Sequence, residues 1–272
     1  MVATPIGNLE DITYRAVRVL READLIACED TRHTRKLLDH YGIDAKLISY
    51  HEHNEAERAQ ELMQKLQAGV NVAQVSDAGM PGVSDPGYRL IKLAIEHGIP
   101  VVPVPGASAL VSALAASGLP TDAFEFRGFL PARSGQRRTE LESIRSAQHT
   151  VIFYEAPHRI REKLEDVVAV LGPGRPLVIA RELTKVHEEF LRGTAGALAA
   201  EVLTRELKGE ITLLIGKAAE GEQTVDEVDL RSRLQQIMRE QKLDEKAALK
   251  VLAKERGVSK SEVYREVQRG KR

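Results

Sequence analysis

Five short apolar segments recur along the first 117 residues, and a polar or Gly- and Pro-rich segment follows each of them. Stretches with helical spacing, such as Ile12 to Ala23, separate the apolar segments. Strands that alternate with helices favour a mainly parallel sheet, so we expect an α/β fold. The first strand directly follows Met1, and we expect a few residues of a longer strand to be missing there. The expected strands are Val2–Ala3, Leu25–Cys28, Leu47–Ser49, Val70–Val75 and Val101–Val104.

A turn-rich segment, Ser117 to Asp122, precedes a second alternation of strands and helices. Two of its expected strands follow one another with no helix between them, so the second sheet is predicted to be mixed. The expected strands are Phe124–Phe129, Thr150–Tyr154, Leu177–Ala180, Val186–Arg192 and Ile211–Ile215, with helices around Gln136–Ala147 and Ile160–Leu171.

The C-terminal region differs from the rest in charge. Residues 228–272 carry 13 Lys and Arg against 7 Asp and Glu, in a chain whose formal net charge is −1. Helices are expected near Leu234 and over Asp244–Arg256, with Gly257 as C-cap and Ser259–Glu262 as a capping box that opens a third helix. This pattern predicts a helix-turn-helix. Its basic charge fits either a contact with a polyanion or a solvated helical face. The expected domains are therefore 1–117, 122–220 and a basic helical domain over 228–272.

Composition excludes several classes of protein. The single cysteine, Cys28, rules out an internal disulfide framework and fits a reducing cytoplasm. No apolar run reaches the length of a membrane span, and we expect no membrane partner. Nucleotide-binding signatures of the G-x-G-x-x-G and P-loop types are absent from the sequence. His33, His51 and His53 lack the spacing of a metal site, so no metal is expected.

The unusual residues follow the expected strands. In an open α/β sheet, ligands bind beside the carboxyl ends of the strands. A single such segment is adequately explained as a tight turn, but five on one rim indicate a binding cleft. The segments are Thr4–Asn8, Glu29–His33, His51–Glu55, Ser76–Gly87 and Pro105–Ala109, and the second domain adds Glu155–Arg159 and Arg181–Lys185.

Six segments together resemble the tetrapyrrole methylase superfamily, and within it the enzymes that methylate a ribose 2′-oxygen of small-subunit ribosomal RNA. They span residues 1 to about 220 in the superfamily's order, and the tail resembles the helix-turn-helix appended to many members. Met80 departs from the pattern, which has Thr there. The segments are Ala3–Glu10 (ATPIGNLE), Ala27–His33 (ACEDTRH), Val75–Gly87 (VSDAGMPGVSDPG), Val104–Ala109 (VPGASA), Phe153–Arg159 (FYEAPHR) and Ala180–Lys185 (ARELTK).

The resemblance implies two α/β domains with S-adenosylmethionine in the cleft between them, usually in a homodimer. It implies that a cytidine 2′-hydroxyl in the decoding region of 16S ribosomal RNA is methylated on the small ribosomal subunit. The cofactor-binding positions carried over are Pro5, Ser76, Asp77, Met80, Ser108, Ala109, Tyr154 and Leu183.

The hydroxyl must lose a proton, so a carboxylate or imidazole within reach would assist the transfer. Asp30 is the first candidate, followed by Glu29, His33 and Glu155. The residues expected to hold RNA phosphates are Arg32, Arg159, Arg181 and Lys185.

Two other functions fit parts of the sequence. A tetrapyrrole C-methyltransferase would share the cofactor site, but the polar EDTRH and HEHNE segments and the basic tail argue against a porphyrinoid pocket. A DNA-binding regulator would explain the tail but not five strand-end loops on one rim.

Overall fold

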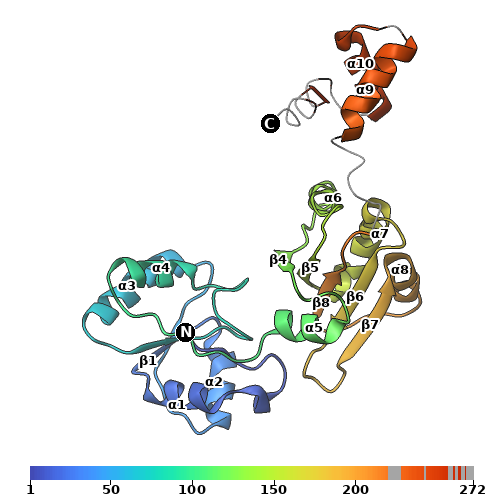
Figure 1. The fold of residues 1–272 in the computed structure, drawn as a ribbon. Coiled ribbons are helices and arrows are strands. Elements are labelled where there is room, and N and C mark those ends of the chain that lie inside the picture. Colours follow the sequence, from blue (N-terminus) through green and yellow to red (C-terminus); the bar gives the residue numbers. More distant parts are fainter. Residues whose placement is uncertain (220–227, 242, 257–259, 261–262, 265–266, 268–272) are drawn as a thin grey trace. The chain divides into compact units, whose positions relative to one another are not determined.

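The computed structural model describes residues 1–219, 228–241, 243–256, 260, 263, 264 and 267 of the 272. The chain divides into two compact units. One consists of Met1–Glu142 with His149–Gly216, and the other of Ser143–Gln148 with Lys217–Arg272. The first unit contains two β-sheets, which confirms the expected α/β fold (Figure 1). The predicted division into three domains stays a prediction.

The first sheet is parallel and has the strand order β2-β1-β3. Its strands are β1 (Leu25–Cys28), β2 (Leu47–Ser49) and β3 (Val72–Gln74). Ile26 and Cys28 pack on one side with Leu20 and Leu38, whereas Ala27, between them in sequence, packs on the other side with Leu62. This alternation is the two-residue period of a strand covered on both faces.

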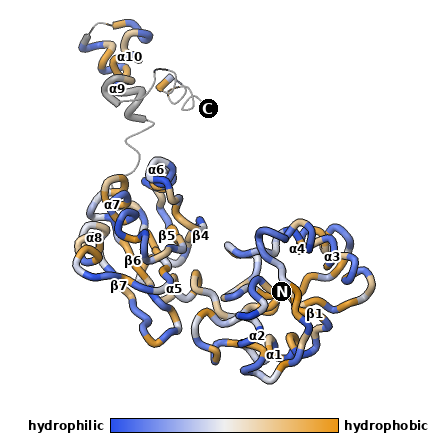
Figure 2. Tube along the Cα trace, turned by 180° about the vertical axis from the view of Figure 1, so that it is seen from behind, coloured by the Kyte–Doolittle hydropathy of each residue, from blue (hydrophilic) through white to orange (hydrophobic). Residues whose placement is uncertain are grey.

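Helices cover both faces of this sheet. The 3₁₀ turn η1 (Leu9–Asp11) leads into α1 (Tyr14–Glu22), which shares one core with α2 (Thr31–His40). The opposite core contains α3 (Glu55–Gln67) and α4 (Tyr88–Glu96). Figure 2 shows the hydrophobic stretch at β1 between these two pairs of helices. Caps fix where the helices begin: Thr13 Oγ1 accepts from Ala16 N at 3.1 Å, and Asp30 Oδ1 accepts from Arg32 N at 2.8 Å.

The second sheet is mixed and has the order β4-β5-β8-β6-β7. Strands β4 and β5 are parallel, whereas the other neighbours are antiparallel. Helix α5 (Ala109–Ser117) packs on this sheet through Ala113 and Leu114, and Ile6 joins the same core. The strands are β4 (Phe124–Phe129), β5 (Thr150–Glu155), β6 (Pro176–Arg181), β7 (Glu189–Thr194) and β8 (Ile211–Ile215), and the helices are α6 (Ser134–Ser143), η2 (Pro157–Arg159), α7 (Ile160–Leu171) and α8 (Ala195–Thr204).

In the second unit, α9 (Val228–Gln241) packs against α10 (Glu245–Arg256). Ile237 and Leu252 lie at the centre of their core, and Asp244 Oδ1 caps α10 by accepting from Ala247 N at 2.6 Å. The expected cap Gly257 and the two capping-box residues Ser259 and Glu262 lie outside the described residues. No helix in the described part of the chain is long and apolar enough to cross a membrane.

Three expectations were wrong in detail. Val2 and Val104 form only a single parallel bridge instead of two strands, because prolines at 103 and 105 have no N–H to donate to a ladder. The strand expected at Val186–Arg192 is β7, three residues later, since Thr184 adopts a positive φ of 68° in the preceding turn. Thr31–His33, expected in a loop, form the first turn of α2.

Candidate active site

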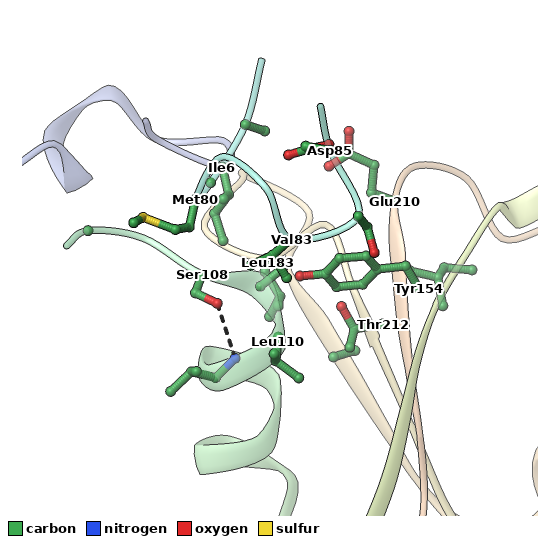
Figure 3. Close-up of a pocket in the computed structure, with 18 of the residues that line it drawn as sticks. Ile6, Met80, Val83, Asp85, Ser108, Leu110, Tyr154, Leu183, Glu210 and Thr212 are labelled. Carbon is green, nitrogen blue, oxygen red and sulfur yellow. Dashed lines mark hydrogen bonds between the residues drawn. The ribbon is translucent and has the colours of Figure 1, made fainter. Parts of the chain in front are cut away.

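A cavity of about 690 Å³ is lined by the loop that follows β3, by the segment that leads into α5 and by residues of the second sheet (Figure 3). Its walls are mainly apolar, three carboxylates line it, and none of its lining residues is Lys or Arg. The lining residues are Ile6, Ala78, Gly79, Met80, Val83, Ser84, Asp85, Pro103, Pro105, Gly106, Ser108, Ala109, Leu110, Val111, Phe129, Tyr154, Glu155, Ala180, Leu183, Glu210, Ile211 and Thr212.

Backbone contacts join the loops that form the cavity. Thr4 N donates to Gly79 O at 2.9 Å, and Gly79 N donates back to Thr4 O at 3.1 Å. A Cβ on Gly106 would lie 2.9 Å from the Ala3 Cβ, so only glycine lets these two segments approach so closely. These contacts fix the relative positions of three loops before any ligand arrives.

The start of helix α5 forms one wall of the cavity. Ser108 is its N-cap, and its Oγ accepts from Val111 N at 3.5 Å (Figure 3). Tyr154 also lines the cavity; burial raises its pKa, and the nearby Leu110 backbone opposes part of this rise. The Phe126 ring packs edge-on against Tyr154, with centroids 4.8 Å apart. The cavity therefore has a fixed aromatic side chain facing a helix N-terminus.

Asp85 is a partly buried carboxylate in the cavity wall. Burial raises its pKa, and Asp77 raises it further, whereas Ser76 lowers it. Ser76 Oγ is buried and makes no hydrogen bond of normal geometry among the described residues, yet it lies close enough to Asp85 to oppose part of the shift. The preceding residue, Ser84, has a φ of 60°, so the backbone is strained directly before Asp85.

Three of the four candidate bases lie where β1 meets α2. Burial raises the pKa of Glu29, and Asp77 and Asp85 raise it further. Asp30 is the N-cap of α2 and forms a bidentate pair with Arg32, whose hydrogen bonds hold the pKa of Asp30 well below its usual range. His33 is exposed on the first turn of α2. Asp30 is therefore a weaker proton acceptor than Glu29.

Glu155, the fourth candidate, lines the cavity but forms a buried ion pair with Lys163. Both side chains are 1% exposed. Lys163 Nζ also donates to Leu130 O at 2.9 Å, and Glu155 Oε1 accepts from Ala156 N at 2.8 Å. These contacts use much of the hydrogen-bonding capacity of the carboxylate.

The predicted RNA-binding cations differ in how they are paired. Arg181 donates to Glu189 and to Lys208 O, both at 3.1 Å, and Lys185 pairs with Glu182 and Glu210 at 2.8 and 3.2 Å. The side chain of Arg32 is 88% exposed despite its bond to Asp30. Arg159 is exposed, and its Nε donates to His158 Nε2 at 3.0 Å. Arg32 and Arg159 are thus the more accessible pair.

The structure brings six predicted site residues to the cavity: Met80, Ser108, Ala109, Tyr154, Glu155 and Leu183. Pro5 and Ser76 are buried and do not line it, and Asp77 accepts a hydrogen bond from Asp30 N at 3.1 Å outside it. Asp85 and Glu210 were not predicted. Asp85 lies within the motif segment Val75–Gly87, which could have indicated it. Glu210 directly precedes β8 and belongs to no motif segment.

Comparison with known proteins assigns the family. The sequence pattern of the tetrapyrrole (corrin/porphyrin) methylases matches residues 1–199. The chain belongs to the tetrapyrrole methylase family. Among its relatives is "Ribosomal RNA small subunit methyltransferase I" of Halalkalibacterium halodurans, 49% identical over 97% of this chain and 92% of the relative. The protein of the same name from Escherichia coli O157:H7 is 48% identical over the same shares of the two chains.

Solved structures show the same tetrapyrrole methylase fold. Uroporphyrin-III C-methyltransferase from Thermus thermophilus superimposes with a TM-score of 0.56 at 22% identity, over 80% of this chain and 93% of that one. Another structure of the T. thermophilus enzyme is a complex with S-adenosylhomocysteine, with a TM-score of 0.55 at 20% identity over 81% and 97% of the two chains. Diphthine synthase reaches 0.60 at 15% identity, over 81% and 91%. At these identities the likeness concerns the fold alone. The comparisons agree with the methyltransferase class expected from the sequence.

Proposed function

We propose that the protein transfers a methyl group from S-adenosylmethionine to the 2′-hydroxyl of a cytidine in the decoding region of 16S ribosomal RNA. The observation that carries this proposal is the preformed cavity. It lies in a methylase family member, and two relatives that match 97% of this chain are named as ribosomal RNA methyltransferases. Its volume of about 690 Å³ suits a ligand of nucleoside size.

The residues of the cavity fit this cofactor. Ile6, Met80 and Leu183 provide apolar walls for an adenosyl group, and the free N–H groups at the start of α5 suit a polar edge or carboxylate. Of the predicted cofactor residues, Met80, Ser108, Ala109, Tyr154 and Leu183 line this space, and Pro5, Ser76 and Asp77 would support its walls.

S-adenosylmethionine supplies an electrophilic methyl on sulfur, so that the ribose oxygen gains a bond to carbon while the carbon–sulfur bond breaks and S-adenosylhomocysteine leaves. The protein contributes by orienting the reactants and excluding water, which supplies much of the rate of such a displacement. The ribose hydroxyl also needs a proton acceptor. We favour Asp85 because it lines the cavity and burial favours its protonated form, which suits a group that receives a proton. Glu29 is second, ahead of Asp30, His33 and Glu155.

The decisive experiment is transfer of labelled methyl to small ribosomal subunits that lack the modification, followed by mapping of the modified nucleotide. Label on the 2′-oxygen of a single cytidine supports the proposal. The control is the Asp85→Asn variant, which should bind the cofactor and transfer little label. Label on a tetrapyrrole instead of the subunits would refute ribosomal RNA methylation and support tetrapyrrole C-methylation. Label on neither substrate would refute both activities.

Other parts of the proposal concern assembly and location. We expect a homodimer in the cytoplasm, with the basic region 228–272, Arg32 and Arg159 contributing phosphate contacts. Sedimentation of the purified chain at several concentrations tests the dimer directly.

A further inference from the structure

One face of α1 is both exposed and basic. Tyr14, Arg15, Arg18 and Arg21 follow a helical spacing that brings them to one side, opposite the buried Ala16 and Leu20. Tyr14 is 99% exposed. An aromatic side chain left wholly in water gains no stability from packing, so its presence beside three arginines points to contact with another molecule.

Charges on this side of the sheet are incompletely paired. Among the residues that the structure describes, Arg15 and Lys36, on the exposed side of α2, have no carboxylate within 4.0 Å, and Arg21 donates to a neutral acceptor, Tyr41 O, at 3.2 Å. Arg18 is paired with Glu22. The charge of three cations on these two helices is thus left uncompensated.

The helices on the opposite face of the same sheet show how cations are paired elsewhere on this sheet. Helices α3 and α4 also carry cations, but each of the four forms an ion pair: Arg58 and Lys65 with Glu61, Arg89 with Glu55, and Lys92 with Glu96. Figure 1 shows α1 and α2 on one side of β1 and α3 and α4 on the other. Unpaired positive charge therefore distinguishes the α1–α2 side of this sheet from its α3–α4 side.

The α1 face also begins beside the cavity. Its cap Thr13 lines a shallow hollow together with Pro105 and Gly106, and both of these residues line the cavity as well. The cavity itself has no Lys or Arg among its lining residues. A polyanionic substrate that delivers one nucleoside to the cavity must therefore have its phosphates held by residues outside it.

We infer that the exposed face of α1, with Lys36 of α2, is a docking surface for ribosomal RNA. The inference rests on the proposed function, because it assigns a surface to that function's substrate. Arg15, Arg21 and Lys36 contact backbone phosphates, and Tyr14 stacks on an unpaired base. RNA is favoured over a protein partner by the combination of uncompensated cations with a solvated aromatic ring next to a cavity of nucleoside size.

Two pairs of matched full-length variants test the inference. Arg15→Gln/Lys36→Gln removes two unpaired cations, and Arg58→Gln/Lys92→Gln removes two paired cations from the opposite face. Tyr14→Ala removes the aromatic ring from the first residue of α1. Tyr88→Ala removes the ring from the first residue of α4, which is 69% exposed. The measurements are KM for unmodified small subunits, affinity for 16S ribosomal RNA at several salt concentrations, and the Kd of S-adenosylmethionine.

The Arg15/Lys36 variant should flatten the slope of log affinity against log salt by about 1.5, as expected for two lost phosphate contacts. Tyr14→Ala should raise KM about tenfold. Both should keep the wild-type Kd for S-adenosylmethionine, and the two controls should match wild type throughout. Equal slopes and KM values for test and control variants would overturn the inference while leaving the proposed function intact. A changed oligomeric state with an unchanged slope would show that a second copy covers this face, and absence of methyl transfer by the wild type would refute the proposed function itself.

Discussion

The buried ion pair between Lys163 and Glu155 allows a demanding test of the architecture around the cavity. Replacing Lys163 by Met keeps the aliphatic stem and removes the ammonium group. Glu155 then loses its counter-ion in a site where both side chains are 1% exposed, and Leu130 O loses a donor at 2.9 Å. The variant therefore leaves a buried charge without compensation.

Breaking a buried pair from one side costs about 3–5 kcal/mol of unfolding free energy. The lost hydrogen bond to Leu130 O accounts for about 1 kcal/mol of this. With an m-value of about 2 kcal/mol/M, the urea midpoint should fall by about 2 M. The double variant Glu155→Gln/Lys163→Met removes both charges and should regain most of the loss, because neutral side chains need no ionic partner.

Urea unfolding followed by circular dichroism measures both effects. The surface pair Arg18–Glu22, with side chains 60% and 55% exposed, provides the control, and Arg18→Met should cost less than about 0.5 kcal/mol. A cost below about 1 kcal/mol for Lys163→Met, or a double variant no more stable than the single one, would refute the reasoning. The double variant also tests catalysis: if it is stable and active, Glu155 is not the proton acceptor.

Three further predictions concern the cavity and the tail. Gly106→Ala should weaken S-adenosylmethionine binding at least about tenfold in calorimetry, because the new Cβ would lie 2.9 Å from Ala3; Gly135→Ala, with no atom within 4 Å of the new Cβ, should not. If Asp85 accepts the proton, kcat/KM should fall as pH decreases through its raised pKa, at a pH above the usual value of about 4, and Asp85→Asn should abolish that limb and lower kcat about 10²-fold or more. Deleting residues 228–272 should weaken RNA binding and leave the calorimetric Kd of the cofactor unchanged; loss of cofactor binding as well would contradict this prediction.

Much of the sheet structure could be predicted from the sequence because its signals are local. Leu25–Cys28 and Ile211–Ile215 are mainly apolar runs that coincide with β1 and β8, and Phe124–Phe129, with three phenylalanines among polar residues and glycine, coincides with β4. Val104 lies between prolines that lack a backbone donor, a loss that the apolar pattern of residues 101–104 does not reveal. The start of β7 depends on the turn at Thr184, whose positive φ no residue type in the segment indicates.

The site was predictable only where its residues belong to motif segments. Met80, Ser108 and Tyr154 all line the cavity: Met80 lies in the loop after β3, Ser108 caps α5 and Tyr154 lies at the end of β5. Ion pairing was not predictable. The partners of Arg181 and Glu155 come from β7 and α7, so their pairing depends on how the sheet and helices pack and not on any local pattern.

The connection between the Pro105–Gly106 loop and α5 limits how far the cavity can open. Gly106 is held against Ala3 of the first sheet region, whereas α5 is packed on the second sheet through Ala113 and Leu114. Only Ala107 and Ser108 span the interval to the first helical residue. Even a fully extended tether of this length covers at most about 10 Å between the Cα atoms of Gly106 and Ala109. Cofactor entry and product release can therefore involve only a small separation of Gly106 from α5. Any wider opening has to come from movement of the loop that contains Asp85.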